Sequence, residues 1–254
     1  MEKVKITAII PTLNEEIHIE AAIKSVRFAD EIIVIDSFST DKTVELAKKH
    51  QVHLIQRVFD DFSTQKNFAI DKAKHEWIYV LDADERVTPK LEKEILEAVK
   101  KPKNFVGFYV YRTFYFMGKK IKYGGAQRDK VARLFLKKHC EYNGNLVHEV
   151  ITANGKLGYL KHKLDHFSYR NFDHFISKLN HYAALRAKRL NAEGKKVTFF
   201  HLLIKPPARF VIHYIIRLGF LDGFAGFVIA KTQAYGVLAR YIKLRLLNKG
   251  IKEN

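Results

Sequence analysis

The feature that most constrains the fold is an apolar segment that ends abruptly in three carboxylates. Trp77 to Leu81 is followed by Asp82, Asp84 and Glu85. Five consecutive bulky residues, with aromatic and β-branched members, are typical of a buried strand. Acids at the carboxyl end of such a strand lie where open α/β sheets bind ligands. Because neighbouring carboxylates repel and are costly to desolvate, the segment predicts a bound Mg²⁺ or Mn²⁺ bridged to a diphosphate. A solvated acidic turn before the next helix is the simpler alternative.

Strands and helices alternate over the first hundred residues. Strands are predicted at 4–11, 31–36, 52–57 and 77–81, with helices at about 12–26, 39–50, 63–74 and 90–100. Alternation of this kind is typical of a mostly parallel sheet whose faces are covered by helices. Thr12 and Glu15 have the spacing of a capping box, which predicts that the first helix begins there.

Beyond residue 100 the pattern is richer in aromatic and β-branched residues. Short strands are predicted at 105–116, 131–136 and 146–152, a helix at 172–190, and broken apolar segments at 199–247. No linker of Pro or Ser interrupts the first 195 residues. We therefore expect one α/β domain at 1–195, with a ligand-binding half at 1–100 and a second half at 101–195, and a helical appendage at 196–254.

The single cysteine, Cys140, excludes an intramolecular disulfide and a cysteine-based zinc site, which suits a reducing compartment. The chain enters a strand pattern at once, so no secretory signal is expected. No stretch of a dozen residues lacks a charge, which predicts that no segment spans a membrane.

The net charge of +18 is unevenly distributed. Residues 1–100 carry 15 Lys and Arg against 19 Asp and Glu, residues 101–194 carry 19 against 6, and residues 195–254 carry 11 against 2. A basic surface downstream of residue 100 suits a nucleic acid, an anionic membrane or an anionic acceptor. Within 199–247 the basic residues occur among large aromatic and aliphatic residues. This pattern favours an amphipathic helix at a membrane surface. The alternative is a helix packed on the protein's own core with a solvated basic face.

Three loops are expected at the same edge of the sheet, because the carboxyl ends of parallel strands converge. They are Pro11 to Glu16, the turn at Asp36, and Asp82 to Glu85. A nucleotide-diphosphate donor would use all three: the first loop and Asp36 for the base and ribose, and the Asp-x-Asp for the cation and diphosphate. The chain has neither a Walker A loop nor a dinucleotide Gly-x-Gly-x-x-Gly.

At this point the sequence resembles glycosyltransferase family 2, whose members have the GT-A fold. The resemblance rests on Pro11-Thr12-Leu13-Asn14-Glu15-Glu16, Ile35 to Thr43, Gln65-Lys66-Asn67 and Asp82-Ala83-Asp84. Within the family the chain is most similar to lipopolysaccharide core β-glucosyltransferases, through Arg133-Leu134-Phe135, Val147-His148-Glu149 and Leu221 to Gly226. The resemblance implies an inverting transfer from a nucleotide-diphospho-sugar, typically UDP-glucose, with Mg²⁺ or Mn²⁺.

The resemblance also implies roles for individual residues. The nucleotide-sugar would be bound by Pro11, Thr12, Asn14, Glu15, Asp36, Lys66, Asn67 and Asp82, and the metal by Asp84 with Asp82. The chain departs from the family pattern after Asp36, where many members have a second acid and a glycine instead of Ser37 and Phe38.

An inverting transfer needs a carboxylate that deprotonates the acceptor hydroxyl. The best match to the family's base is Glu149, the only acid between Glu141 and Asp165, and Asp129 is its competitor. His148 and His166 are further candidates to approach the metal, although a lone histidine is more often structural.

The expected partners are UDP-glucose, a lipid-linked acceptor such as the lipopolysaccharide core, and an anionic membrane surface. The expected location is the cytoplasmic face of the inner membrane. Two other functions compete with this one. A glycosyltransferase acting on polyprenyl phosphate usually has spanning helices or a second acidic motif. If the chain were a basic nucleic-acid-binding protein, Asp36, Asp82 and Asp84 at one edge of the sheet would have no role. We therefore expect no nucleic-acid partner.

Overall fold

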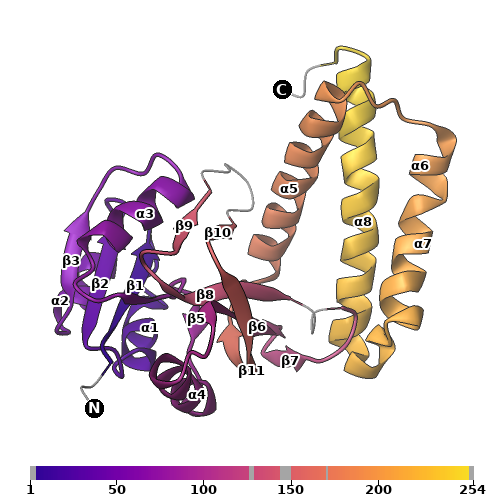
Figure 1. Cartoon of the computed structure of the whole chain (residues 1–254). Coiled ribbons are helices and arrows are strands. Elements are labelled where there is room, and N and C mark those ends of the chain that lie inside the picture. Colours follow the sequence, from indigo (N-terminus) through magenta and orange to yellow (C-terminus); the bar gives the residue numbers. More distant parts are fainter. Residues whose placement is uncertain (1–3, 126–128, 144–149, 170, 252–254) are drawn as a thin grey trace. The chain divides into compact units, whose positions relative to one another are not determined.

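The structure is a computed structural model that describes residues 4–125, 129–143, 150–169 and 171–251. The chain forms two compact units (Figure 1). Unit 1 comprises Met1–Arg112 and Asp129–His166, and unit 2 comprises Thr113–Arg128 and Phe167–Asn254. The division predicted at residue 195 concerns function and stays a prediction.

Unit 1 is built on a large sheet whose first half is parallel. Strand β1 (Ile6–Thr12) pairs with β2 (Glu31–Asp36) on one side and with β4 (Trp77–Val80) on the other, and β3 (His53–Gln56) follows β2. All three pairings are parallel, as the alternation of strands and helices predicts.

The second half of the sheet is antiparallel. The order along the sheet is β3-β2-β1-β4-β8-β6-β11-β5. It adds β8 (Lys130–Leu136), β6 (Phe105–Phe116), β11 (Lys156–His166) and the two-residue β5 (Glu85–Arg86). A separate antiparallel pair is formed by β9 (Cys140–Tyr142) and β10 (Ile151–Ala153). The strand predicted at 146–152 lies mostly outside the described residues.

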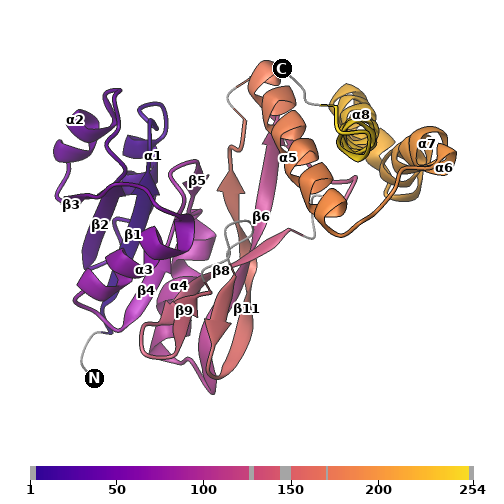
Figure 2. The same cartoon turned by 90° about the horizontal axis from the view of Figure 1, so that it is seen from above.

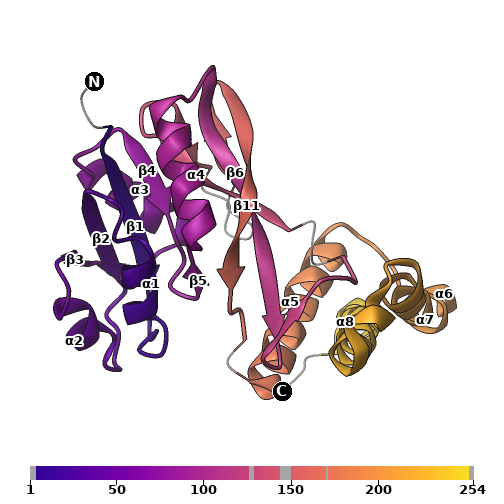
Figure 3. The same ribbon diagram turned by 90° about the horizontal axis from the view of Figure 1, so that it is seen from below.

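Helices cover both faces of this sheet because side chains alternate along each strand (Figure 3). Ala8 and Ile10 point into one core cluster with α1 (Ile19–Ser25) and α4 (Pro89–Lys100). Ile9 points into the other cluster with α3 (Phe62–Lys72). The short helix α2 (Thr43–Lys48) follows β2. The α/β fold class of the GT-A type is thus confirmed.

The predicted start of the first helix is wrong. Thr12 is still part of β1, where it pairs with Asp36, and α1 begins only at Ile19. The backbone N–H groups of His18 and Ile19 both donate to the carbonyl of Glu15, each at 2.8 Å. The residues between strand and helix therefore form a loop, and the capping-box spacing of Thr12 and Glu15 is coincidental.

Unit 2 is mainly helical. It contains α5 (Phe172–Ala192), α6 (Phe199–Leu203), α7 (Lys205–Val211), a π-helical turn (Ile212–Ile216), a 3₁₀ turn (Gly219–Asp222) and α8 (Gly223–Asn248). The long helix α8 lies between α5 and the α6–α7 segment (Figures 1 and 2). A short strand, β7 (Lys119–Ile121), pairs with the end of β6.

The chain reverses sharply between the π-helical turn and α8. Leu218 adopts a left-handed backbone with φ 57°, and a Cβ on Gly226 would lie 1.9 Å from the carbonyl oxygen of Gly219. The buried Asp222 anchors this corner by accepting from the N–H groups of Lys122 and Tyr123. Among the described residues no single helix is long and apolar enough for a membrane span, although the pair Phe199–Ile216 and Gly219–Asn248, bent by 71°, passes by length and composition.

Candidate active site

Parallel pairing brings three loops to one edge of the unit 1 sheet. Thr12 at the end of β1 lies opposite Asp36 at the end of β2, and Ile9 lies opposite Val80 near the end of β4. Pro11 is paired with Ile35 within the sheet, directly before the first loop. Such an edge is the usual ligand-binding position of an α/β sheet.

The loops after β1 and β2 hold each other in place. The N–H of Asn14 donates to the hydroxyl of Ser39 at 2.9 Å, and the N–H of Thr40 donates to the side-chain oxygen of Asn14 at 2.8 Å. The N–H of Glu15 donates to the hydroxyl of Thr43 at 2.8 Å. Asn14 can do this because it adopts φ 55°, a conformation that asparagine tolerates better than most residues. The two motifs of the resemblance are therefore one structural unit.

Asp36 is fully buried and engaged by its own loop. One of its oxygens accepts from the N–H of Ser39 at 3.0 Å and from the amide of Gln56 at 3.1 Å, and the other accepts from the Ser39 hydroxyl. Beside it, the buried Oγ1 of Thr12 has no hydrogen-bond partner among the described residues. A buried hydroxyl without a partner is costly, so the position of Thr12 suits a contact with a ligand.

Two consecutive residues of α3 link the strand ends. The amide of Gln65 donates to the hydroxyl of Ser37 at 2.9 Å, and Nζ of Lys66 lies 3.4 Å from Oδ1 of Asp82. Lys66 is buried and its ammonium lies 5.1 Å from the centre of the Tyr142 ring. The next residue, Asn67, exchanges two hydrogen bonds of 3.0 Å with the backbone of Tyr142. Asn67 thus holds β9 against α3.

Asp82 begins a chain of paired charges. Arg133 contacts Asp82 with Nη2, and the same atom lies 2.6 Å from Oε1 of the fully buried Glu85. Arg112 extends the chain, with Nη1 3.4 Å from Glu85 and Nη2 2.8 Å from Asp129. Each carboxylate in this network is therefore matched by a guanidinium group.

These pairs decide the charge of Asp82. Burial alone would raise the pKa of this carboxyl, but Arg133 and Lys66 outweigh it and hold the pKa well below its usual value. Burial would lower the pKa of Arg133, but Asp82 and Glu85 raise it well above its usual value. Asp82 is therefore an ionised carboxylate whose charge the protein itself already compensates.

Asp84 lies in a different environment. Its Oδ2 is 3.4 Å from Nε2 of His166, the last residue of β11. A carboxylate oxygen beside an imidazole nitrogen fits a divalent cation that takes its other ligands from substrate phosphates. The described part of the chain contains no group of three or more His, Cys, Asp or Glu arranged for a metal. The donor set that Asp84 and His166 supply, one carboxylate oxygen and one imidazole nitrogen, fits such a cation.

Of the two candidate bases, Glu149 and Asp129, the described residues include Asp129 alone. Glu149 and the neighbouring His148 lie outside the described residues. Asp129 is described, and both of its oxygens accept from Arg112, at 2.8 and 3.0 Å.

Sequence reasoning missed the pairing of Arg133, Glu85 and Arg112. In the sequence, Arg133 is noted only as part of the motif Arg133-Leu134-Phe135. The structure shows that it is a buried arginine in the middle of the apolar strand β8. A charged residue in such a run needs a buried partner, which is the signal that could have revealed it.

The chain is similar to several known proteins. The model of the family "Glycosyl transferase family 2" matches residues 7–151. An uncharacterized glycosyltransferase of Rickettsia typhi is 30% identical over 96% of this chain and 88% of its own length. The lipopolysaccharide core biosynthesis glycosyltransferase LpsC of Rhizobium meliloti is 29% identical over 91% of this chain and 88% of its own length. The crystal structure of TarS from S. aureus aligns with a TM-score of 0.47 and 13% identity, over 99% of this chain and 93% of that one.

The chain therefore belongs to glycosyltransferase family 2.

Proposed function

We propose that the protein transfers a hexose, with inversion, from a UDP-sugar such as UDP-glucose to a lipid-linked glycan such as the lipopolysaccharide core. The observation that carries the proposal is the different pairing of the two aspartates after β4. Asp82 is neutralised by Arg133 and Lys66, whereas Asp84 lies beside His166. Asp82 is thus tied to two cations of the protein, whereas Asp84 shares its position with an imidazole nitrogen, a pair of ligand types that suits a divalent cation bound to a diphosphate.

The donor would be held by groups that the structure brings to one edge. The unpartnered Thr12 hydroxyl and the loop fixed by Asn14 lie at the ends of β1 and β2. Mg²⁺ or Mn²⁺, held by Asp84 with His166, would neutralise charge on the leaving diphosphate. Lys66 and Arg133 keep Asp82 ionised and also neutralise its charge. Asp82 therefore adds no net negative charge where the diphosphate would bind.

Glu149 is the proposed base. The acceptor hydroxyl must lose its proton to a carboxylate on the side opposite the leaving group. Asp129 is a weaker candidate because Arg112 engages both of its oxygens, and that pair would compete with the acceptor hydroxyl. In the sequence, Glu149 stands between β9 and β10, in the half of the chain at 101–195.

The proposed acceptor is carried by a membrane lipid, and the protein would bind the cytoplasmic face of the inner membrane peripherally. Two observations support this. One relative, 29% identical, is called a lipopolysaccharide core biosynthesis glycosyltransferase. Between Phe199 and Phe224, twelve large apolar side chains are exposed, more than isolated surface hydrophobics would supply.

A donor screen tests the proposal. Nucleotide-sugar hydrolysis and thermal stabilisation are measured for UDP-glucose, UDP-galactose and GDP-mannose, each with Mn²⁺ and with EDTA. We expect a UDP-hexose to stabilise the parent protein only with the cation, and Asp84→Asn to lose that response at an unchanged melting temperature. A response that persists in EDTA, or in Asp84→Asn, would show that the metal assignment is wrong. An acceptor arm with lipopolysaccharide core and polyprenyl phosphate separates the two lipid acceptors.

A further inference from the structure

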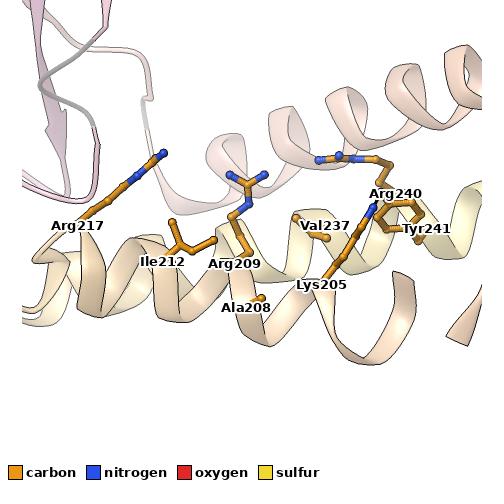
Figure 4. Close-up of a pocket in the computed structure, with 8 residues that line it drawn as sticks. All are labelled: Lys205, Ala208, Arg209, Ile212, Arg217, Val237, Arg240 and Tyr241. Carbon is orange, nitrogen blue, oxygen red and sulfur yellow. Dashed lines mark hydrogen bonds between the residues drawn. The ribbon is translucent and has the colours of Figure 1, made fainter. Parts of the chain in front are cut away.

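Unit 2 contains a basic cavity that the donor site does not use. The cavity has a volume of about 370 Å³ and lies against α7, the π-helical turn and α8. Four cationic side chains line it together with four uncharged ones. They are Lys205, Arg209, Arg217 and Arg240, with Ala208, Ile212, Val237 and Tyr241 (Figure 4).

Acids do not neutralise these cations in the part of the chain that the structure describes. None of the four forms an ion pair with a described Asp or Glu. Unit 2 as a whole contains 20 Lys and Arg against four Asp and Glu. One of these acids, Asp222, is buried and already accepts from the N–H groups of Lys122 and Tyr123. The potential in the cavity is therefore strongly positive.

Two of the four cations contact other side chains of unit 2. Nζ of Lys205 donates to the hydroxyl of Tyr241 at 2.8 Å and lies 4.9 Å from the centre of its ring. Nη1 of Arg209 lies 3.4 Å from Nε2 of His213. In Figure 4 the nitrogen atoms of Arg209, Arg217 and Arg240 lie on one side of α7 and α8. Cations held on one side in this way form a preorganised site rather than a solvated surface.

Arg240 lies among other cations. Its Nε is buried and has no hydrogen-bond partner among the described residues. Burial lowers the pKa of this guanidinium, and the neighbouring cations Arg186 and Arg209 lower it further. An anion in the cavity would accept from the arginine and relieve the repulsion.

Phosphate is the anion that this donor set fits best. A guanidinium fork matches two phosphate oxygens, and Lys205 adds a compact point charge. The lining also includes apolar groups from Ile212 and Val237, and the exposed apolar side chains between Phe199 and Phe224 belong to the same helices and turns. This combination of cations with apolar surface indicates a phosphate that is attached to a lipid.

We propose that this cavity binds the phosphate group of an anionic lipid headgroup at the membrane surface. The proposal rests on the membrane binding proposed above and deepens it, and it requires neither the sugar donor nor Glu149. It identifies the group by which unit 2 holds its lipid, and it accounts for the excess of cations there.

The first experiment measures binding of inorganic phosphate to the full-length protein by calorimetry, at constant ionic strength and in EDTA. Without a divalent cation the donor site is not expected to take up phosphate. We expect R209Q/R240Q to weaken binding by at least about tenfold, because hydrogen bonds to a charged group contribute on that scale. The matched control R245Q/K249Q removes two charges from the exposed end of α8 and should bind like the parent. Equal losses in both double variants, or no binding by the parent, would overturn the proposal.

The second experiment identifies the source of the phosphate. Co-sedimentation is compared for phosphatidylcholine vesicles containing phosphatidic acid or, at matched net charge, phosphatidylserine. We expect the parent to prefer phosphatidic acid, added inorganic phosphate to compete, and R209Q/R240Q to lose the preference while R245Q/K249Q keeps it. If inorganic phosphate binds but the two double variants sediment equally with phosphatidic acid, the site serves free phosphate and the lipid assignment is wrong. Failure of UDP-hexose transfer would leave both results unchanged.

Discussion

The two units manage charge in opposite ways. In unit 1 the carboxylates of Asp82, Glu85 and Asp129 are matched by Arg133 and Arg112 within a buried or partly buried network. In unit 2 the cations of the cavity lie together, and no described acid is paired with them. A site that is compensated internally can keep its geometry before a ligand arrives. A site that lacks its counter-charge depends on the ligand to supply it.

Under the two proposals, the units bind different ligands. The paired site of unit 1 suits a donor that brings its own cation, because net charge there is already low. The unpaired site of unit 2 suits an anion that arrives alone.

Removal of the proposed base should have the largest effect. Losing a positioned general base typically costs ~10²–10⁴-fold in rate. Glu149→Gln should therefore reduce kcat by that amount while the affinity for UDP-hexose stays close to the parent value. Asp129→Asn is the control. If Asp129→Asn loses the rate and Glu149→Gln keeps it, the base is Asp129.

Replacing one arginine by methionine in each unit tests the comparison through the free energy of unfolding. Arg133→Met removes the cation that Asp82 and Glu85 share, which leaves them only the longer contacts with Lys66 and Arg112, and should cost roughly 3–5 kcal/mol. Arg240→Met removes a cation that has no described acidic partner and should change stability by less than about 1 kcal/mol. Urea unfolding measures both: Trp77, the single tryptophan, reports on unit 1, and far-UV circular dichroism reports on all helices, of which the two longest, α5 and α8, belong to unit 2. Equal losses would contradict the contrast between the units.

The exposed apolar surface of unit 2 should matter for membranes and not for folding. Phe199 and Phe224 are 74% and 71% exposed. Burial of an aromatic side chain contributes about 1.5–3 kcal/mol, so F199S/F224S should weaken binding to anionic vesicles at least roughly tenfold. Val58→Ser in unit 1, where the side chain is 73% exposed, is the control and should bind like the parent. Unchanged sedimentation of F199S/F224S would remove these residues from the membrane surface.

The smallest effect is a pH dependence. Burial lowers the pKa of His213 from its ordinary value of 6.5, and Arg217 and Arg209 lower it further. The unfolded chain therefore binds more protons below about pH 6.5, so stability should fall on acidification, by less than about 1.4 kcal/mol per pH unit for one group. His213→Asn should remove this component, and added phosphate should reduce it in the parent. Urea titrations at pH 5.5 and 7.5 that show the same difference for parent and His213→Asn would contradict the assignment.

The sequence predicts the parallel half of the sheet well, because buried strands such as 31–36 and 77–81 are continuous apolar runs ending in acids. It does not predict β11, whose lysines and histidines obscure the alternation of Gly158, Leu160 and Leu164. An arginine inside the apolar strand β8 indicates that a buried acidic partner exists, but the choice of Glu85, 48 residues away, depends on β8 pairing with β4. Local pattern therefore predicts the strands and the acids of the rim, whereas the cations that pair with those acids follow from tertiary structure.

The most direct test measures ligand binding at both sites in the same set of variants. Binding of UDP-glucose with Mn²⁺ and binding of inorganic phosphate in EDTA are both measured by calorimetry for the parent, Asp84→Asn and R209Q/R240Q. Asp84→Asn should lose donor binding and keep phosphate binding, and R209Q/R240Q should do the reverse. If either variant lowers both affinities equally at an unchanged melting temperature, the two units do not hold separate sites and the account is wrong.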